Sequence, residues 1–344
     1  MNYKLLGKSG LRVSELCLGT MTFGEEWGWG ANKQESKKVF DAFVNAGGNF
    51  LDTANRYTEG TSEKFLSDFI SHDREYYVVA TKYSLFEPER SKHVNSGGNH
   101  RKNMMQSVEN SLKRLKTDYI DLYWLHAWDF STPVEEVMRG LDDLVRAGKI
   151  MYIGISDTPA WIVSRANTIA EFRGWAQFVG LQIEYSLIQR TPERDLIPMA
   201  NELDLAITPW GALGGGALTG KYLNNMDAEG RVQKDSARRN ERSTAITTEV
   251  KKTADDLGVT SGQVALNFIR QQKGVIIPIV GARTVSQIED SLGCVNFTIP
   301  DEQMQRLDEV SKIEPGFPHD FLKQDFVLDL VFGGMHKKIH NHRK

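Results

Sequence analysis

Four polar residues able to perform acid–base chemistry stand at, or just after, the ends of apolar segments: Asp52, Tyr57, Lys82 and His126. The segments 49–52, 78–82 and 120–126 read as short buried strands. A fourth segment, 152–157, ends in Ser-Asp. Parallel barrels bring the C-terminal ends of their strands to one face, so we expect these side chains to converge there.

Together the four residues suit protonation of a carbonyl oxygen. A phenol has a pKa near 10, and a neighbouring ammonium such as Lys82 is expected to lower the pKa of Tyr57. Asp52 can pair with Lys82, and a neutral His126 can hydrogen-bond the carbonyl oxygen. None of these groups supplies hydride, so the chemistry requires a reduced nicotinamide.

Each residue also has an ordinary structural interpretation. An Asp–Lys pair at strand ends usually closes a layer of a barrel, and a strand-end histidine is more often a core residue than a catalyst. All four in matched positions favour the catalytic interpretation.

Two segments are candidates for binding the phosphates of a dinucleotide. Neither G-x-G-x-x-G nor a P-loop occurs. The glycine-rich run 211–221 follows the seventh predicted strand, and Gly281-Ala282-Arg283-Thr284 follows the eighth. Barrels often bind phosphate after these two strands. Thr284 with Gln287 predicts a helix start, and Arg283 suits the 2′-phosphate of NADP.

The alternation of strands and helices predicts a (β/α)8 TIM barrel. A β-hairpin is predicted over 3–13. The predicted strands are 16–19, 49–52, 77–82, 119–125, 150–155, 179–184, 205–209 and 275–280. The predicted helices are 33–46, 61–71, 100–115, 134–147, one opened by Thr158-Pro159, 193–203, 247–257, 261–272 and 285–292. We therefore expect one domain over 1–344, with a core of about 3–313 and a C-terminal extension, 314–344.

Three long connections are expected on the C-terminal side of the barrel: 84–99, 213–247 and the residues beyond 314. The second carries five basic residues, which either fold over a polyanionic ligand or form a charged surface loop: Arg231, Lys234, Arg238, Arg239 and Arg242. The apolar extension either covers its own barrel mouth or makes an intersubunit contact in a homo-oligomer.

The composition argues against other classes of protein. A net charge of -3 and a pI near 6.3 provide no basic field for nucleic acid. No apolar window is long enough to cross a membrane, and the N-terminus lacks a signal-like apolar region. Cys17 and Cys294 are expected to be buried free thiols, so we expect a cytoplasmic protein. No histidine motif supports a metal site.

Nearly the whole chain, from Leu5 to about Ile313, resembles the aldo-keto reductases. The resemblance is carried by these motifs: Leu18-Gly19-Thr20-Met21, Phe50-Leu51-Asp52-Thr53-Ala54 with Tyr57, Thr81-Lys82, Asp121-Leu122-Tyr123-Trp124-Leu125-His126, Gly154-Ile155-Ser156, Gln182-Ile183-Glu184-Tyr185-Ser186 and Gly281-Ala282-Arg283-Thr284. It implies a barrel fold and NADP(H)-dependent oxidation and reduction of CH–OH and carbonyl groups.

The resemblance also implies roles for individual residues. Asp52, Tyr57, Lys82 and His126 match the catalytic tetrad, with Tyr57 as the general acid. Thr20, Met21 and Asp52 match residues near the nicotinamide ribose, Ser156, Asp157 and Gln182 the carboxamide contacts, and Trp210 the ring that stacks on the nicotinamide. Gly211, Leu213 and Lys221 match the pyrophosphate loop, and Gly281, Arg283, Gln287 and Asp290 the adenosine-phosphate site.

Two positions depart from the family pattern. Asp157 stands where the family usually has Asn, and a carboxylate can accept from the carboxamide NH2 but cannot donate to its oxygen. Asp290-Ser291 replaces a longer Glu-Asn pair on the adenine side. Both changes bear on cofactor affinity and on the preference for NADP over NAD.

The glycine-rich loop and the Gly-Ala-Arg-Thr motif look like the branch that contains aryl-alcohol dehydrogenases and potassium-channel β subunits. Two functions follow: a carbonyl reductase acting on a small aldehyde or ketone, and an NADPH-binding, redox-sensing partner subunit with slow turnover. Aromatic residues expected near the mouth favour the first and predict a substrate pocket: Phe23, Trp27, Trp29 and Trp128.

Overall fold

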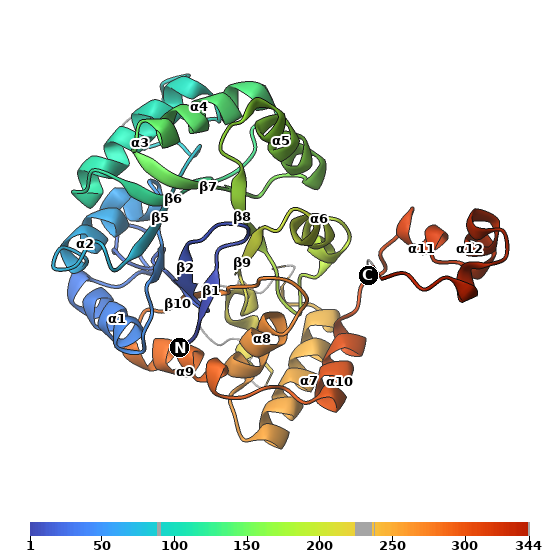
Figure 1. The fold of residues 1–344 in the computed structure, drawn as a ribbon. Helices are drawn as coiled ribbons and strands as arrows, with labels where there is room; N and C mark the ends of the chain where they lie inside the picture. The colour runs from blue at the N-terminus through green and yellow to red at the C-terminus, as the bar shows by residue number, and fades with distance from the viewer. Residues whose placement is uncertain (88–90, 224–235, 237, 343–344) are drawn as a thin grey trace.

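Eight parallel strands form a nearly closed barrel with helices around it, which confirms the predicted fold (Figure 1). The computed structural model describes residues 1–87, 91–223, 236 and 238–342. The barrel strands are β3 (Cys17–Gly19), β4 (Phe50–Asp52), β5 (Val78–Tyr83), β6 (Ile120–Leu125), β7 (Ile150–Ser156), β8 (Phe178–Glu184), β9 (Ala206–Trp210) and β10 (Ile279–Gly281). β10 pairs with β3, and a bridge between Ile207 and Ile276 joins β9 to the chain before β10.

Helices follow the strands and cover the outside of the barrel (Figure 1). The α-helices are α1 (Lys33–Asn45), α2 (Thr61–Phe69), α3 (Arg101–Leu115), α4 (Val134–Arg146), α5 (Ala160–Arg173), α6 (Leu196–Glu202), α7 (Glu241–Leu257), α8 (Ser261–Arg270), α9 (Val285–Leu292), α10 (Asp301–Ser311), α11 (His319–Leu322) and α12 (Asp325–Phe332). The short 3-10 turns are η1 (Tyr57–Gly60), η3 (Thr191–Glu193), η4 (Gly214–Thr219), η5 (Gly293–Asn296) and η6 (His336–Lys338).

Local capping explains several helix starts. The side chain of Asn32 accepts a hydrogen bond from the backbone N–H of Glu35, so α1 begins where the sequence predicts. At α7, Asn240 and Ser243 form a reciprocal capping box, so the helix begins at Glu241 and the predicted start at 247 was too late.

A cluster of buried apolar side chains, of which Trp124 is the largest, fills the interior of the barrel, and the N-terminal hairpin closes it. Trp124 of β6 is fully buried, and a Cβ atom at Gly154 of β7 would lie 2.2 Å from its ring. A Cβ atom at Gly180 of β8 would lie 2.8 Å from the same ring, so both positions require glycine. The hairpin of β1 (Tyr3–Leu5) and β2 (Arg12–Ser14) is confirmed, and buried Leu6 and Val13 join the apolar cluster inside the barrel.

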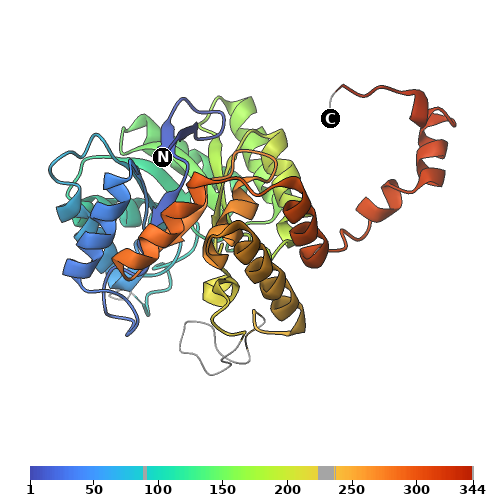
Figure 2. The same cartoon turned by 90° about the horizontal axis from the view of Figure 1, so that it is seen from below.

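The C-terminal extension leaves the barrel after α10 as an arm, here defined as residues 314–342. It projects away from the barrel (Figures 1 and 2), so the expectation that it covers its own barrel mouth was wrong. Phe317, Leu330 and Val331 are 84%, 78% and 65% exposed. The arm thus presents apolar side chains that its own barrel does not bury. No helix in the described part of the chain is both long and apolar enough to cross a membrane.

Candidate active site

A buried ion pair lies at the centre of the C-terminal face of the barrel. Lys82 Nζ, at the end of β5, donates to Asp52 Oδ2 at 2.5 Å and to the carbonyl oxygen of Thr53 at 2.8 Å. The second oxygen of Asp52 accepts from Gln182 Nε2 at 2.9 Å. Both charged residues are almost fully buried. A buried charge is tolerated only when paired and hydrogen-bonded, and here both conditions are met.

Tyr57 and His126 are brought to this ion pair from two different elements. Tyr57 begins η1, the turn that follows β4, and His126 directly follows β6. Lys82 Nζ lies 4.8 Å from the centroid of the Tyr57 ring. The rings of Tyr57 and His126 meet edge to face, with centroids 5.9 Å apart. The structure therefore brings all four predicted residues together.

Burial and charge set the protonation states of these groups. Burial raises the pKa of Tyr57 more than Lys82 lowers it, so the expected effect of Lys82 is present but the pKa lies above its ordinary value. Burial would lower the pKa of Lys82, but Asp52 and Tyr57 more than compensate, and the pKa lies above its ordinary value. Burial, with a smaller contribution from Lys82, lowers the pKa of His126 to about 3. At neutral pH the site thus holds a protonated phenol, an ammonium and a neutral imidazole.

A second group of polar residues lies beside the ion pair at the ends of β7, β8 and β9. Ser156 pairs with Gln182 in the parallel register, and both are buried. Ser156 Oγ is buried and has no hydrogen-bond partner among the described residues. Asp157 adopts a left-handed backbone conformation with φ 41°, and its Oδ1 accepts from Trp210 Nε1 at 3.1 Å. The Ser156 hydroxyl can therefore donate a hydrogen bond to a polar ligand, and the side-chain oxygens of Ser156 and Asp157 can accept one.

Two residues of the segment after β3 differ from expectation. Thr20 is fully buried, and its hydroxyl donates to the carbonyl oxygen of Asp52 at 3.0 Å. Its side chain therefore stabilises the end of β4. Phe23 is also fully buried and packs edge-on against Phe69, with ring centroids 6.2 Å apart. A side chain with no exposed surface cannot line a substrate pocket. Met21 remains partly exposed.

The predicted aromatic wall is formed in part. The centroid of Trp27 lies 5.7 Å from that of Trp29 and 6.4 Å from that of Tyr57. Trp128 is half-buried, and its backbone N–H donates to the carbonyl oxygen of Asp157 at 3.5 Å. Trp27 and Trp29 therefore lie beside the phenol, whereas Trp128 packs against the main core.

Sequence reasoning missed the charged residues that hold this wall. Trp27 Nε1 donates to Glu59 Oε1 at 2.9 Å, and Glu59 also pairs with Arg56. The Arg56 guanidinium lies 5.9 Å from the ring of Trp27 and 5.0 Å from that of Phe86. The Arg-x-x-Glu spacing over residues 56–59 was the only feature of the sequence that indicated this Arg56–Glu59 pair.

The two predicted phosphate segments have suitable local geometry. Gly214, Gly215 and Gly216 of η4 all have positive φ, which glycine adopts without steric cost. Lys221, which follows this loop, places its Nζ 4.8 Å from the centroid of the Tyr222 ring. Gly211 has a φ of 68°, and Leu213 packs partly buried against the main core.

The segment after β10 forms a helix start, as the sequence predicts. Thr284 caps α9 by accepting from the backbone N–H of Gln287, while Gln287 Oε1 accepts from the backbone N–H of Arg283 at 2.9 Å. The Arg283 residue itself is exposed. Gly281, the last residue of β10, is exposed too, and Asp290 accepts from Gln263 Nε2. An exposed guanidinium at a helix start is a suitable site for a phosphate group.

The basic loop is engaged with the protein where it is described. Arg238 donates to Glu184 Oε1 at 2.5 Å and lies 6.0 Å from the centroid of Trp210. Arg239 lies over the ring of Tyr222, and Arg242 donates to two backbone carbonyl oxygens. Two residues of the expected basic cluster, Arg231 and Lys234, lie outside the described residues.

Comparison with known proteins gives the family. The model of the aldo/keto reductase family matches residues 15–312. The chain is an aldo-keto reductase. It is 39% identical to an aryl-alcohol dehydrogenase [NADP(+)] of Phanerodontia chrysosporium, over 90% of this chain and 86% of that protein. It is 38% identical to the norsolorinic acid reductase stcV of Emericella nidulans, over 91% and 82%. A putative aryl-alcohol dehydrogenase of Saccharomyces cerevisiae is 33% identical, over 94% and 90%.

Membership of the family makes this aldo-keto reductase an NADP(H)-dependent oxidoreductase acting on carbonyl groups. The residues present suit such a cofactor. The unpartnered hydroxyl of Ser156 and the Trp210 ring stand beside the tetrad, and Arg283 is exposed at the start of α9. Among the described residues no cluster of three or more His, Cys, Asp or Glu side chains is arranged to hold a metal ion.

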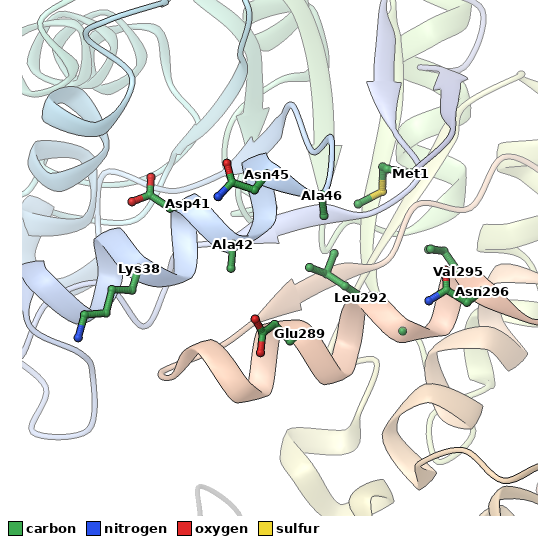
Figure 3. Close-up of a pocket in the computed structure, with 11 residues that line it drawn as sticks. Met1, Lys38, Asp41, Ala42, Asn45, Ala46, Glu289, Leu292, Val295 and Asn296 are labelled. Atoms are coloured by element: carbon green, nitrogen blue, oxygen red, sulfur yellow. The ribbon is translucent and has the colours of Figure 1, made fainter.

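A hollow on the outer surface of the aldo-keto reductase is separate from this site. It lies between α1 and α9 and is lined by Lys38, Asp41 and Ala42 of the first helix and by Glu289 and Leu292 of the second (Figure 3). Both helices belong to the outer layer, and none of the tetrad residues lines the hollow. Its open, mixed polar lining gives it no part in the chemistry at the strand ends.

Proposed function

We propose that this chain reduces the carbonyl group of an aromatic aldehyde or ketone with NADPH and that Tyr57 is the general acid. One observation carries the proposal: a protonated, half-buried phenol lies against both a neutral imidazole and a buried ammonium. A proton donor for a carbonyl oxygen must keep its proton at neutral pH and release it only as negative charge develops.

Each tetrad residue has a separate task in this proposal. Tyr57 donates its phenolic proton to the developing alkoxide. Lys82 stabilises the phenolate that remains, because its ammonium lies 4.8 Å from the ring centroid. Asp52 keeps Lys82 charged and fixed in position. His126 is neutral, so its ring orients the substrate by hydrogen bonding rather than by charge.

The cofactor, when bound, supplies the hydride. We assign Ser156, Asp157 and Gln182 to its carboxamide, and Trp210 to the face of its ring. Backbone groups of Gly211 and Leu213, with Lys221, are assigned to the pyrophosphate, and Met21 to the ribose side, where Thr20 contributes only through its support of Asp52. We assign the adenosine-phosphate end to Gly281, Arg283, Gln287 and Asp290. Arg283 is the specific partner of a 2′-phosphate because it is exposed at a helix start.

The aromatic substrate class rests on the wall beside Tyr57. Trp27 and Trp29 present ring surface next to the phenol, and Trp128 lies next to Asp157. Flat apolar surfaces bind aromatic compounds by stacking and by loss of hydrated area. The names of relatives, aryl-alcohol dehydrogenase and norsolorinic acid reductase, point to the same class.

The decisive experiment follows NADPH consumption with a panel of aromatic and short aliphatic aldehydes. Tyr57→Phe is expected to lower kcat roughly a hundredfold to ten-thousandfold while NADPH binding stays nearly unchanged, because only the proton donor is lost. Tyr3→Phe, which removes a surface hydroxyl bonded to Gly47, is the matched control. Full turnover by Tyr57→Phe would remove Tyr57 as the acid. Tight NADPH binding with negligible turnover by the wild type would instead support a redox-sensing partner subunit.

We also propose that the arm pairs with a second copy of the chain. Its apolar residues project where its own barrel cannot bury them, and a continuous exposed apolar segment normally finds a partner. Light scattering should then give the mass of an oligomer for the wild type and of a monomer for Leu330→Asp. Gln324→Asp adds the same charge at an exposed polar position of the arm and should leave the oligomer intact. A monomeric wild type would contradict this proposal.

A further inference from the structure

The carboxylate at Asp157 is an unusual group for the position it occupies. It lies at the end of β7, and its Oδ1 is held by Trp210 Nε1 from the end of β9. Its left-handed backbone, with φ 41°, is further fixed by a hydrogen bond from its N–H to the carbonyl oxygen of Gln182 at 3.2 Å. The acidic side chain is therefore placed by three neighbouring strand ends rather than left free in a loop.

Asp157 is exposed, so it can exchange a proton with water, and charged groups of both signs surround it. Glu184, at the end of β8, raises the pKa of Asp157, and its own charge is paired with Arg238. Lys82, from the end of β5, lowers the pKa of Asp157, as does the hydrogen bond from Trp210. Loss of hydration is the largest effect, and the pKa lies above its ordinary value. The phenol of Tyr57 also faces this carboxyl group and is neutral.

The two oxidation states of a nicotinamide place opposite demands on such a group. The oxidised ring carries a positive charge, which favours a neighbouring carboxylate. The reduced ring is neutral, so it offers the carboxylate no compensating charge. A protonated carboxyl group can also donate a hydrogen bond to a carboxamide oxygen, which a carboxylate cannot do.

We propose that Asp157 couples proton binding to the oxidation state of the cofactor: it takes up a proton from solvent when NADPH binds and remains a carboxylate when NADP+ binds. This inference rests on the proposed function, because it requires the nicotinamide to lie beside Asp157. It makes the preference between NADPH and NADP+ depend on pH. Raising the pH through the titration of Asp157 shifts the preference toward NADP+, and lowering the pH shifts it toward NADPH.

Calorimetry of cofactor binding, without substrate, tests the coupling directly. NADPH and NADP+ are titrated into the wild-type protein in buffers of different ionisation enthalpy, at a series of pH values that begins at the lowest pH at which the protein stays folded. The slope of binding enthalpy against buffer enthalpy counts the protons taken up. Both cofactors carry the same 2′-phosphate, so the difference between them removes its ionisation. We expect greater uptake with NADPH and a ratio of the two dissociation constants that changes by about tenfold across the titration.

Two variants test whether the proton is taken up by Asp157 itself. Asp157→Asn should remove both the difference in proton uptake and the pH dependence of the ratio of the two dissociation constants. Glu184→Gln should keep the coupling but move its midpoint to lower pH, because a negative charge beside Asp157 has been removed. An unchanged pH dependence in Asp157→Asn, or equal uptake with both cofactors in the wild type, would overturn the inference alone. Absence of NADPH binding to the wild type would overturn the proposed function as well.

Discussion

Removal of the buried charge of Lys82 should destabilise the protein and abolish its activity for two separable reasons. Lys82→Met leaves Asp52 buried with only the amide of Gln182 as a side-chain partner. Breaking a buried ion pair in this way costs about 3–5 kcal/mol of the free energy of unfolding, because an uncompensated charge remains. Asp52→Asn leaves the ammonium with the carbonyl oxygen of Thr53 and should cost a similar amount.

The double variant Lys82→Met/Asp52→Asn removes both charges and should recover most of this loss, to within about 2 kcal/mol of the wild type. Its turnover should nevertheless stay as low as that of Lys82→Met, since no cation remains to stabilise the phenolate of Tyr57. Urea denaturation followed by tryptophan fluorescence measures the free energy of unfolding. Aldehyde-dependent NADPH consumption measures the turnover.

An exposed ion pair provides the control for this cycle. Lys33 Nζ lies 2.6 Å from Asp68 Oδ2, but both side chains are 40% or more exposed. Lys33→Met should therefore change the free energy of unfolding by less than about 1 kcal/mol and leave turnover unchanged. If the losses in free energy of unfolding of the two single variants simply add in the Lys82/Asp52 double variant, the reasoning about the buried ion pair is refuted. Full turnover by Lys82→Met would refute the role of its charge.

The remaining predictions concern the cofactor, the histidine and the aromatic wall. Arg283→Ala should weaken NADPH binding about tenfold or more and NADH binding hardly at all, as measured by fluorescence quenching, with Arg165→Ala on α5 as control; equal losses would place the 2′-phosphate elsewhere. The imidazole of His126 should titrate near pH 3 by NMR and stay neutral at higher pH; a transition near neutrality would contradict the lowered pKa and the neutral role of the ring. Trp27→Ala should raise KM several-fold for aromatic aldehydes but little for short aliphatic ones; equal changes would argue against stacking.

The barrel and the tetrad were predictable because both follow from short-range patterns. Continuous apolar segments of about four to eight residues, each followed by a helical pattern, identify a parallel sheet buried on both faces. Once the strands are parallel, the residues at their C-terminal ends must share one face. Asp52, Lys82 and His126 could therefore be placed together without any knowledge of their contacts.

Depth of burial could not be predicted in the same way. Thr20 and Phe23 lie close in sequence to residues that border the mouth, yet both side chains face the layer behind it. The segment after β3 has no regular repeat, so the sequence does not indicate which side chains turn inward. The fit of Trp124 against Gly154 and Gly180 likewise depends on three strands that are separated along the chain. The direction in which the arm leaves the barrel is also not indicated by any local pattern.

The direction of the pKa shift of Tyr57 results from opposing effects, so it could be determined only from the structure. This direction has a consequence for catalysis. The sequence identified Lys82 as a neighbour that favours the phenolate, but the larger effect of burial can only be known once the ring is placed. The outcome suits a general acid. A phenol whose pKa is raised keeps its proton until a carbonyl oxygen begins to take it, and the ammonium already present then limits the cost of the anion. A charged His126 would add a second cation and favour premature loss of that proton. Its burial beside Lys82 keeps it neutral, so the same desolvation that holds the proton on Tyr57 also keeps the competing charge out of the site.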